Sequence, residues 1–147
     1  MEDVHVVVDL LRSPSAPPVP VETLAEAVAT ARSLGTAVEV CGAEVLDGLD
    51  LPRRAAVEAA LAEGVHNAVV HAPGAAVEVD LFVRDGVVVA EAVTLGPGPR
   101  ARGFRDVPSR AGAGLAVAAE RLAPVGGLLR TDLDADGTHR LHVEVPR

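Results

Sequence analysis

Glu63-Gly64-Val65-His66-Asn67-Ala68-Val69-Val70-His71 is the segment of this chain of 147 residues in which we look first for function. The segment lies within a stretch of helical periodicity and places Glu63, Asn67 and His71 four residues apart. Because four residues turn an α-helix by only about 40° beyond a full turn, the three side chains share one face. A carboxylate that can orient a nucleophile, an amide oxygen for a hard cation and an imidazole on one rigid helix suit phosphate chemistry.

The helix around this segment is predicted to begin at Pro52 and to stop at Pro73-Gly74. Proline fits the first turn of a helix, and a proline followed by a glycine ends one. The apolar stripe of this helix, on the side away from Glu63 and Asn67, consists of Leu61, Val65, Ala68 and Ala72. Spacing alone also fits a second interpretation, in which Glu63, Asn67 and His71 are no more than the solvated face of an amphipathic helix.

Upstream of this helix, residues 21–34 carry apolar side chains at helical spacing and end at Gly35, so we predict a helix there. Residues 36–41 alternate and are rich in β-branched side chains, which predicts an edge or central strand. Residues 42–52 are predicted to form a loop.

Downstream, the pattern predicts two hairpins with a loop and a helix between them. The predicted elements are, in order, strands at 77–83 and 87–93, a loop at 95–112, a helix at 113–125, and strands at 128–133 and 139–145. The turns are Arg84-Asp85-Gly86 and Asp134-Ala135-Asp136-Gly137. Because most strands are adjacent in sequence, we predict an α+β fold, a two-layer α/β sandwich whose mostly antiparallel mixed sheet is covered on one face by helices.

Composition narrows the class of function. The net charge of −8 and the pI near 5.0 oppose binding to nucleic acid. No apolar stretch reaches the length of a membrane span, and acidic Glu2 and Asp3 stand where a secretory signal would carry positive charge, so we expect a cytoplasmic protein. All 13 basic residues are arginine, which excludes a Walker-type site with its lysine. The lone Cys41 cannot form an internal disulfide, and we expect a small buried side chain there.

Glycines in the predicted loop offer a second site feature. Gly96-Pro97-Gly98 follows a strand, and Gly112-Ala113-Gly114-Leu115 is predicted to stand at the start of a helix. Glycines at such a position let backbone N–H groups approach a polyphosphate, although glycines also simply punctuate loops. The same loop contains arginines that either neutralise phosphate or keep the loop solvated, namely Arg100, Arg102, Arg105 and Arg110.

Taken together, these motifs resemble the ATP-binding catalytic domain of two-component sensor histidine kinases, which has the Bergerat fold of the GHKL superfamily. Glu63 to Ala72 resembles the N-box of that family. Gly112 to Gly127 resembles its second glycine box as written in nitrate-sensor kinases. The resemblance covers residues 19–147 and implies that residues 1–18 are the tail of an upstream helix followed by a proline-rich linker.

The resemblance implies a role for each site residue. Glu63 would act as or orient the catalytic base, Asn67 would bind Mg²⁺, and His71 would contact phosphate or brace the loop. The remaining nucleotide-binding positions, for ATP, would be Thr94, Gly96, Gly98, Gly112, Gly114, Leu115 and Thr138. The domain would transfer the γ-phosphoryl group of ATP to a histidine on a separate dimerisation helix, with a response regulator as an indirect partner.

Two departures from the family pattern leave alternatives open. Thr94-Leu95-Gly96-Pro97-Gly98 stands where the family has Asp-x-Gly-x-Gly, so the aspartate that accepts from the adenine amine is missing. Loss of a charged hydrogen bond predicts affinity about ten- to a hundred-fold weaker unless Thr138 or a water substitutes. No histidine of this chain has the context of a phosphoacceptor. The sequence therefore fits a piece of a longer kinase or a free-standing relative, a pseudokinase-like interaction module, or an anti-sigma-factor serine kinase.

Overall fold

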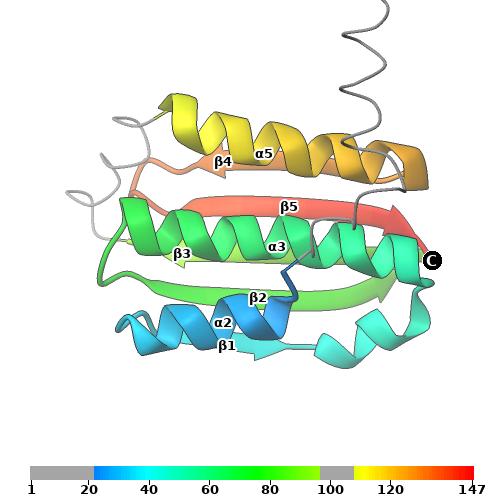
Figure 1. The fold of residues 1–147 in the computed structure, drawn as a ribbon, viewed down its shortest axis with the longest axis horizontal. Helices are drawn as coiled ribbons and strands as arrows, with labels where there is room; N and C mark the ends of the chain where they lie inside the picture. Colours follow the sequence, from blue (N-terminus) through cyan, green and yellow to red (C-terminus); the bar gives the residue numbers. More distant parts are fainter. Residues whose placement is uncertain (1–21, 97–107) are drawn as a thin grey trace, which may run out of the picture.

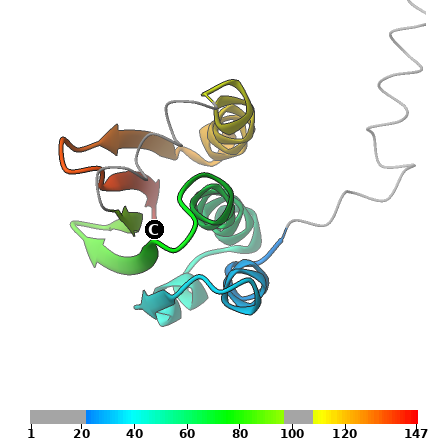
Figure 2. The same ribbon diagram turned by 90° about the vertical axis from the view of Figure 1, so that its left-hand side faces the viewer.

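Five strands form one mixed sheet, and the α-helices of the described chain cover one of its faces (Figures 1 and 2). The structure is a computed structural model that describes residues 22–96 and 108–147, with the backbone alone for 108–113. The helical elements are α2 (Leu24–Ser33), η1 (Ala43–Gly48), α3 (Leu51–His71), α5 (Pro108–Leu122) and η2 (Ala123–Val125). The strands are β1 (Val38–Cys41), β2 (Ala76–Arg84), β3 (Val87–Leu95), β4 (Leu128–Leu133) and β5 (His139–Pro146).

The strand order is β1-β2-β3-β5-β4, with β1 at one edge and β4 at the other. β1 pairs with β2 in parallel, whereas the other three pairings are antiparallel. The prediction of a mostly antiparallel mixed sheet with helices on one face is therefore confirmed, and β1 is an edge strand.

The first hairpin turns through Asp85 and Gly86, which both have positive φ angles, of 53° and 78°. Two consecutive residues in this conformation give the tight turn that matches the twist of the flanking strands. The turn fixes a register in which Val79 pairs with Ala92 and Leu81 pairs with Ala90. These pairs lie on the buried face of the sheet, so the turn sequence determines which side chains enter the core.

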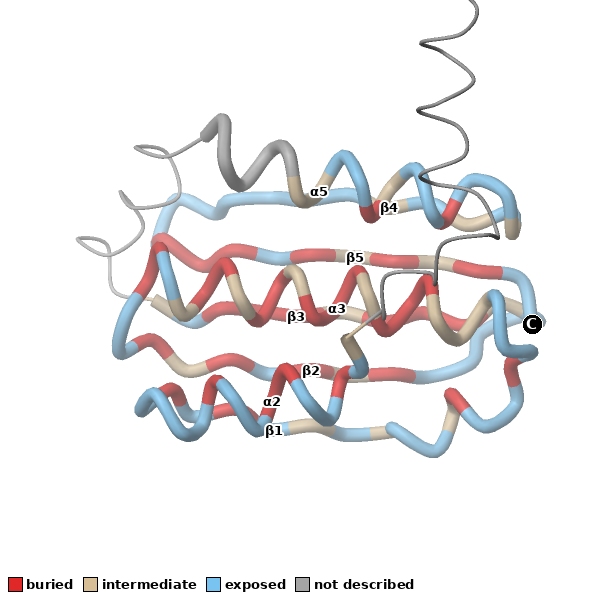
Figure 3. The backbone as a smooth tube through the Cα atoms, in the orientation of Figure 1, coloured by how far each residue is buried: buried red, intermediate tan, exposed pale blue. Residues whose placement is uncertain are grey.

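Helix α3 is the centre of the helical layer. It contacts α2 and α5 at its sides and β2, β3 and β5 beneath it, and buried stretches alternate with partly buried ones along it in Figure 3. Gly64 is the point of closest approach to the sheet. A Cβ atom at Gly64 would lie 2.8 Å from Cδ2 of Leu141 and 3.3 Å from Cβ of Ala92. Because the glycine has no side chain, the helix backbone can lie directly on β3 and β5.

A buried carboxylate joins α2 to α3. Glu58, which is only 8% exposed, accepts the backbone N–H of Leu24 at 2.8 Å and Nε of Arg54 at 3.0 Å. Arg54 also donates to Asp47 of η1 at 3.0 Å. Since Leu24 is the first residue of α2, Glu58 satisfies one of the free N–H groups at the start of that helix and places negative charge at its positive end.

The sheet face opposite the helices is mixed in the described residues, since Val89, Val93 and Phe82 lie on it beside charged side chains. On this face His142 lies between two carboxylates, with Nδ1 2.9 Å from Glu91 and Nε2 2.7 Å from Glu144. Each ring nitrogen of His142 therefore lies within hydrogen-bond distance of a carboxylate oxygen. The hydrogen bond to His142 lowers the pKa of the Glu144 carboxyl below its ordinary value.

The structure corrects three of the sequence-based assignments. α5 begins at Pro108, so the predicted loop is shorter, and Gly112 and Gly114 lie inside the helix rather than at its start. Each glycine costs a helix only about 1 kcal/mol, and proline favours the first turn, so the helix runs through both glycines. Part of the predicted loop 42–52 is the 3-10 helix η1. Cys41, at the end of the edge strand, is exposed rather than buried.

None of the helices in the described part of the chain combines the length and the apolar character that crossing a lipid bilayer requires.

The contact at Gly64 gives a first prediction. Gly64→Ala adds about 1 kcal/mol of helix propensity, but overpacking against β3 and β5 costs about 1–3 kcal/mol. We expect a net loss in the free energy of unfolding, measured by urea denaturation. In a Leu141→Val background, which lacks the Cδ2 atom, the same substitution should cost less. A Gly64→Ala variant that is more stable than the wild type would show that α3 does not rest on the sheet at this point.

Candidate functional site

Most of the buried polar side chains gather at one end of the fold. Seven polar or charged residues are buried among those described, and five of them come from the end of α3, the end of β3 and the turn into β5. These five residues, which we call the polar cluster, are Asn67, His71, Thr94, Thr138 and His139. Figure 1 shows why they meet, because the end of α3, the end of β3 and the start of β5 all lie at the same edge of the molecule.

Asn67 contributes an amide from α3. Its side chain is 6% exposed, and its Nδ2 atom is buried without a hydrogen-bond partner among the described residues. A buried donor without a partner costs about 1–3 kcal/mol, so such groups call for an explanation. Asn67 and His71, which is 8% exposed, are not on a solvated helix face. The purely amphipathic interpretation of this face is therefore wrong for both residues.

Glu63, two turns before His71, faces the glycine segment of α5. A Cβ atom at Gly114 would lie 2.8 Å from Oε1 of Glu63 and closer still to Oε2. The carboxylate therefore rests against the backbone of α5 at a position that only glycine allows. The structure thus brings together two residues that are 51 positions apart and that the sequence assigned to one site.

Thr94 and His139 lie side by side on β3 and β5, where they are register partners. Both are buried, at 2% and 9% exposure. Thr94 lies two residues beyond Ala92, an advance of about 6.7 Å along the strand, while Ala68 lies about 6 Å beyond Gly64 along the helix. Because Gly64 sits over Ala92, Thr94 comes level with the helical turn that carries Asn67.

The turn between β4 and β5 places Thr138. The carboxylate of Asp136 accepts the backbone N–H of Thr138 at 3.0 Å, and this bond lowers the pKa of Asp136 below its ordinary value. Gly137 has a φ angle of +94°. Its carbonyl oxygen lies 3.4 Å from the position that a Cβ atom would take on Gly96, so the end of β3 and this turn are in close contact.

His139 is an ionisable member of the polar cluster, and its pKa is shifted. Burial lowers the pKa of its imidazole below the ordinary value, and the negative charge of Asp132 opposes the shift only in part. The ring is therefore neutral at pH 7. The neutral ring adds one donor and one acceptor to the hydrogen-bonding groups of Asn67, Thr94 and Thr138.

His139 was not among the site residues chosen from the sequence. The signal was present, because the apolar side chains of β5 at Leu141, Val143 and Val145 alternate with polar ones. Because side chains of a strand alternate between its two faces, counting back two residues from Leu141 places His139 on the same buried face. The unusual feature is thus a histidine at a position where the strand pattern requires an inward side chain.

Not every predicted site residue can be placed. Gly98 and the arginines 100, 102 and 105 lie outside the described residues, and for Gly112 and Arg110 only the helical backbone is described. Leu115 packs against the hydrophobic core.

None of the described residues form a group of three or more His, Cys, Asp or Glu that could hold a metal ion. A cation here would therefore depend on Asn67 and on ligand oxygens, as Mg²⁺ in nucleotide sites commonly does.

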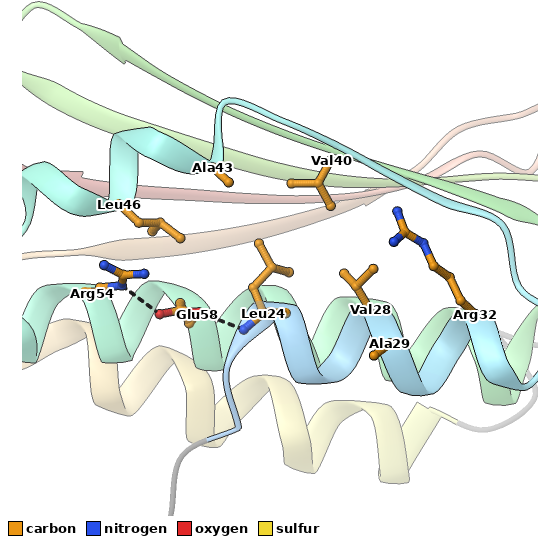
Figure 4. A pocket seen from close by; sticks show the side chains of 10 residues that line it. Leu24, Val28, Ala29, Arg32, Val40, Ala43, Leu46, Arg54 and Glu58 are labelled. Carbon is orange, nitrogen blue, oxygen red and sulfur yellow. Dashed lines mark hydrogen bonds and ion pairs between the residues drawn. The ribbon is translucent and has the colours of Figure 1, made fainter.

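A separate cavity of about 340 Å³ opens between α2, β1 and η1 (Figure 4). Its walls are mainly apolar, from Leu24, Val28, Val40 and Leu46. The polar groups at its ends are already engaged within the protein. Arg32 donates to the carbonyl oxygen of Val38 at 2.7 Å, and Arg54 is paired with Glu58. The cavity lies at the β1 edge, away from the polar cluster on β3 and β5, so we assign the candidate chemistry to the cluster.

The contact between Glu63 and Gly114 gives a second prediction. Gly114→Ala should displace either the Glu63 carboxylate or α5, at a cost of about 1–3 kcal/mol, reduced by about 1 kcal/mol of helix propensity. We expect a lower melting temperature for this variant. The loss should be smaller in a Glu63→Ala background, which has no carboxylate to displace. Equal losses in both backgrounds would mean that the two helices do not touch at these residues.

The lowered pKa of His139 gives a third prediction, on stability against pH. Above the ordinary histidine pKa of about 6.5 the ring is neutral in both the folded and the unfolded chain. As the pH falls below that value, the unfolded chain takes up a proton that the folded chain does not, so stability is lost. We expect the free energy of unfolding of the wild type, relative to His139→Asn, to decrease between about pH 7.5 and 5. If the free energies of unfolding of the two proteins change in parallel with pH, the pKa of His139 is not lowered in the folded chain.

Comparison of sequences finds no match to this chain, whereas comparison of structures finds similar proteins. A scan against protein-family models finds no match, and a search of curated proteins finds none either. Among solved structures, full-length ShkA in complex with AMPPNP is similar with a TM-score of 0.60 at 20% identity, covering 99% of this chain and 36% of that one. This chain thus spans little more than a third of the length of ShkA.

Two further structures come from a blue-light activated histidine kinase, EL346, of Erythrobacter litoralis. The kinase matches with a TM-score of 0.60 at 17% identity, covering 84% of this chain and 43% of that one. Its histidine kinase domain matches with a TM-score of 0.59 at 15% identity, covering 92% of this chain and 72% of that one. The chain therefore has the fold of these histidine kinase structures, which confirms the fold that the sequence resemblance predicted.

Proposed function

We propose that this chain is the ATP-binding catalytic domain of a sensor histidine kinase, which transfers the γ-phosphoryl group of ATP to a histidine on a separate dimerisation helix. The observation that carries the proposal is the buried Nδ2 group of Asn67, which has no hydrogen-bond partner in the described part of the chain. It lies on the same helix as Glu63, and Glu63 lies against the glycine segment of α5. The similar structure of ShkA holds AMPPNP, an ATP analogue.

The polar cluster would bind the base of the nucleotide. Thr94, Thr138 and His139 offer hydrogen-bonding groups without a full charge, and a nucleobase is a flat, uncharged group that needs such partners. Gly96 and the turn at Gly137 approach closely beside them. The absence of side chains at both positions would leave room for the ligand next to the backbone.

The phosphates would lie toward Glu63 and α5. Asn67 would contribute its amide oxygen to Mg²⁺, which when bound neutralises charge on the phosphates. Glu63 would act as the base or orient the acceptor imidazole, since phosphoryl transfer depends mainly on positioning and on charge stabilisation. Any contact from a basic side chain would come from arginine, because the chain has no lysine.

The partner in this proposal is a helix that carries the phosphoacceptor histidine, in the same or a partner chain, with a response regulator as the next recipient. The similar structures support it because this chain corresponds to only part of the full kinases. Residues 1–18, which we propose to be the tail of an upstream helix and a linker, lie outside the described residues.

A second candidate function rests on Thr94. This side chain is 2% exposed and neutral, and it stands where the family resemblance expects a carboxylate that holds the adenine amine. A domain that keeps the fold without the nucleotide would be a pseudokinase-like module that signals by docking. An anti-sigma-factor serine kinase is a more distant alternative.

The fourth prediction tests nucleotide binding directly by isothermal titration with ATP and Mg²⁺. The proposal expects saturable binding by the wild type and its loss in Asn67→Asp, because a buried carboxylate cannot donate and repels phosphate. Val70→Asp is the matched control, since it adds the same charge to α3 at a position that is 68% exposed. Melting curves would confirm that each variant folds.

The outcomes separate the two candidate functions. Binding that survives Asn67→Asp would show that the N–H₂ donor of Asn67 is not needed for the nucleotide and would remove the observation on which the proposal rests. No heat with wild type at millimolar ATP, followed by binding in Thr94→Asp, would establish the pseudokinase alternative. If neither the wild type nor Thr94→Asp binds ATP, the chain does not bind this nucleotide and the proposed function is wrong.

A further inference from the structure

The inward position of His139 has a consequence for ligand selection, on the basis of the proposed function. Along β5 the buried residues are His139, Leu141, Val143 and Val145. The residues between them, Arg140, His142 and Glu144, lie on the opposite face of the sheet. His139 is thus the last side chain of the buried row, and it is the only ionisable residue in that row.

Its surroundings are polar groups from three separate elements. Thr94 of β3 is its register partner, and Thr138 precedes it in the turn. Asn67 of α3 lies level with Thr94, with a buried N–H₂ group that has no partner among the described residues. On β4 the register partner of His139 is Leu133, and the neighbouring Asp132 is the charged group of that strand that acts on the imidazole.

The chemistry of these groups suits one kind of ligand surface. A neutral imidazole has one donor and one acceptor nitrogen, and a hydroxyl group can do either. None of these groups can offset a full charge on a buried ligand. The edge of a purine base, where an exocyclic group stands next to a ring nitrogen, offers the complementary mixture of donors and acceptors.

We propose that His139 is the specificity-determining residue for the base, and that its imidazole hydrogen-bonds the edge of a purine beside Thr94. Adenine and hypoxanthine differ at this edge, because adenine has an amine next to an acceptor nitrogen and hypoxanthine has a carbonyl oxygen next to an N–H group. A fixed imidazole nitrogen satisfies one of these patterns and leaves a polar group unpaired with the other. His139 therefore distinguishes the two bases.

The fifth prediction uses the affinities for ATP and for inosine triphosphate, each with Mg²⁺, measured by isothermal titration on the full chain. The wild type should prefer one of the two nucleotides by about three- to ten-fold, the range of one neutral hydrogen bond. In His139→Leu the preferred nucleotide should bind about three- to ten-fold more weakly, and the ratio of the two affinities should approach one.

Two further variants make the result specific. His142→Leu removes an imidazole from the same strand but from the opposite face, next to Glu91 and Glu144, and it should leave the affinity ratio unchanged. His139→Asn keeps an amide that can rotate to donate or to accept. It should retain more affinity than the leucine variant while the ratio still approaches one. If His139→Leu does not fold, His139→Asn carries the test.

The outcomes keep the proposal distinct from the proposed function. Wild-type protein that binds neither nucleotide overturns the proposed function and this inference with it. Wild-type protein that binds both equally, or a preference that persists in folded His139→Leu or His139→Asn, overturns the role of His139 and leaves nucleotide binding intact. A preference lost in the His139 variants and kept in His142→Leu supports the role.

Discussion

The backbone contact between α3 and the sheet at Gly64 is the constraint on which the rest of the structure depends. A side chain there would meet Leu141 and Ala92, so the helix can lie on β3 and β5 only because none is present. This contact sets the height of α3 above the sheet. It also sets the level at which the next turns, with Asn67 and His71, face the ends of β3 and β5. The position of the polar cluster thus follows from one missing methyl group.

The two sides of α3 are stabilised in different ways. Toward α2, Glu58 binds the start of the neighbouring helix and Arg54, so a buried charge has its partners. Toward α5, Glu63 rests against Gly114, and no ion pair of Glu63 is found among the described residues. The first side therefore has the bonding expected of a structural joint. On the second side, the Glu63 carboxylate has no ion pair and Nδ2 of Asn67 has no hydrogen bond within the described residues. Unsatisfied polar groups of this kind are often found in binding sites.

The sequence predicted the sheet, the helical layer and the first hairpin because period-two and helical patterns, and a turn such as Asp85-Gly86, are local signals. It misplaced the start of α5, since glycine weakens a helix but does not end one, and tertiary contact with α3 outweighs that preference. Burial of Asn67 is set by tertiary packing, which no local pattern contains. His139 was overlooked because its importance comes from its partner Thr94, 45 residues away in the chain.

Cys41 ends the edge strand β1, is exposed, and is the only cysteine of the chain. α5 lies on the far side of the helical layer, next to β4 at the opposite edge of the sheet. A single thiol-reactive fluorophore can therefore be attached without any prior mutation to a part of the sheet that is remote from the glycine segment. A second cysteine placed at exposed Val117 of α5 would complete a donor and acceptor pair. The separation of the two dyes would report directly on any movement of α5 against the sheet.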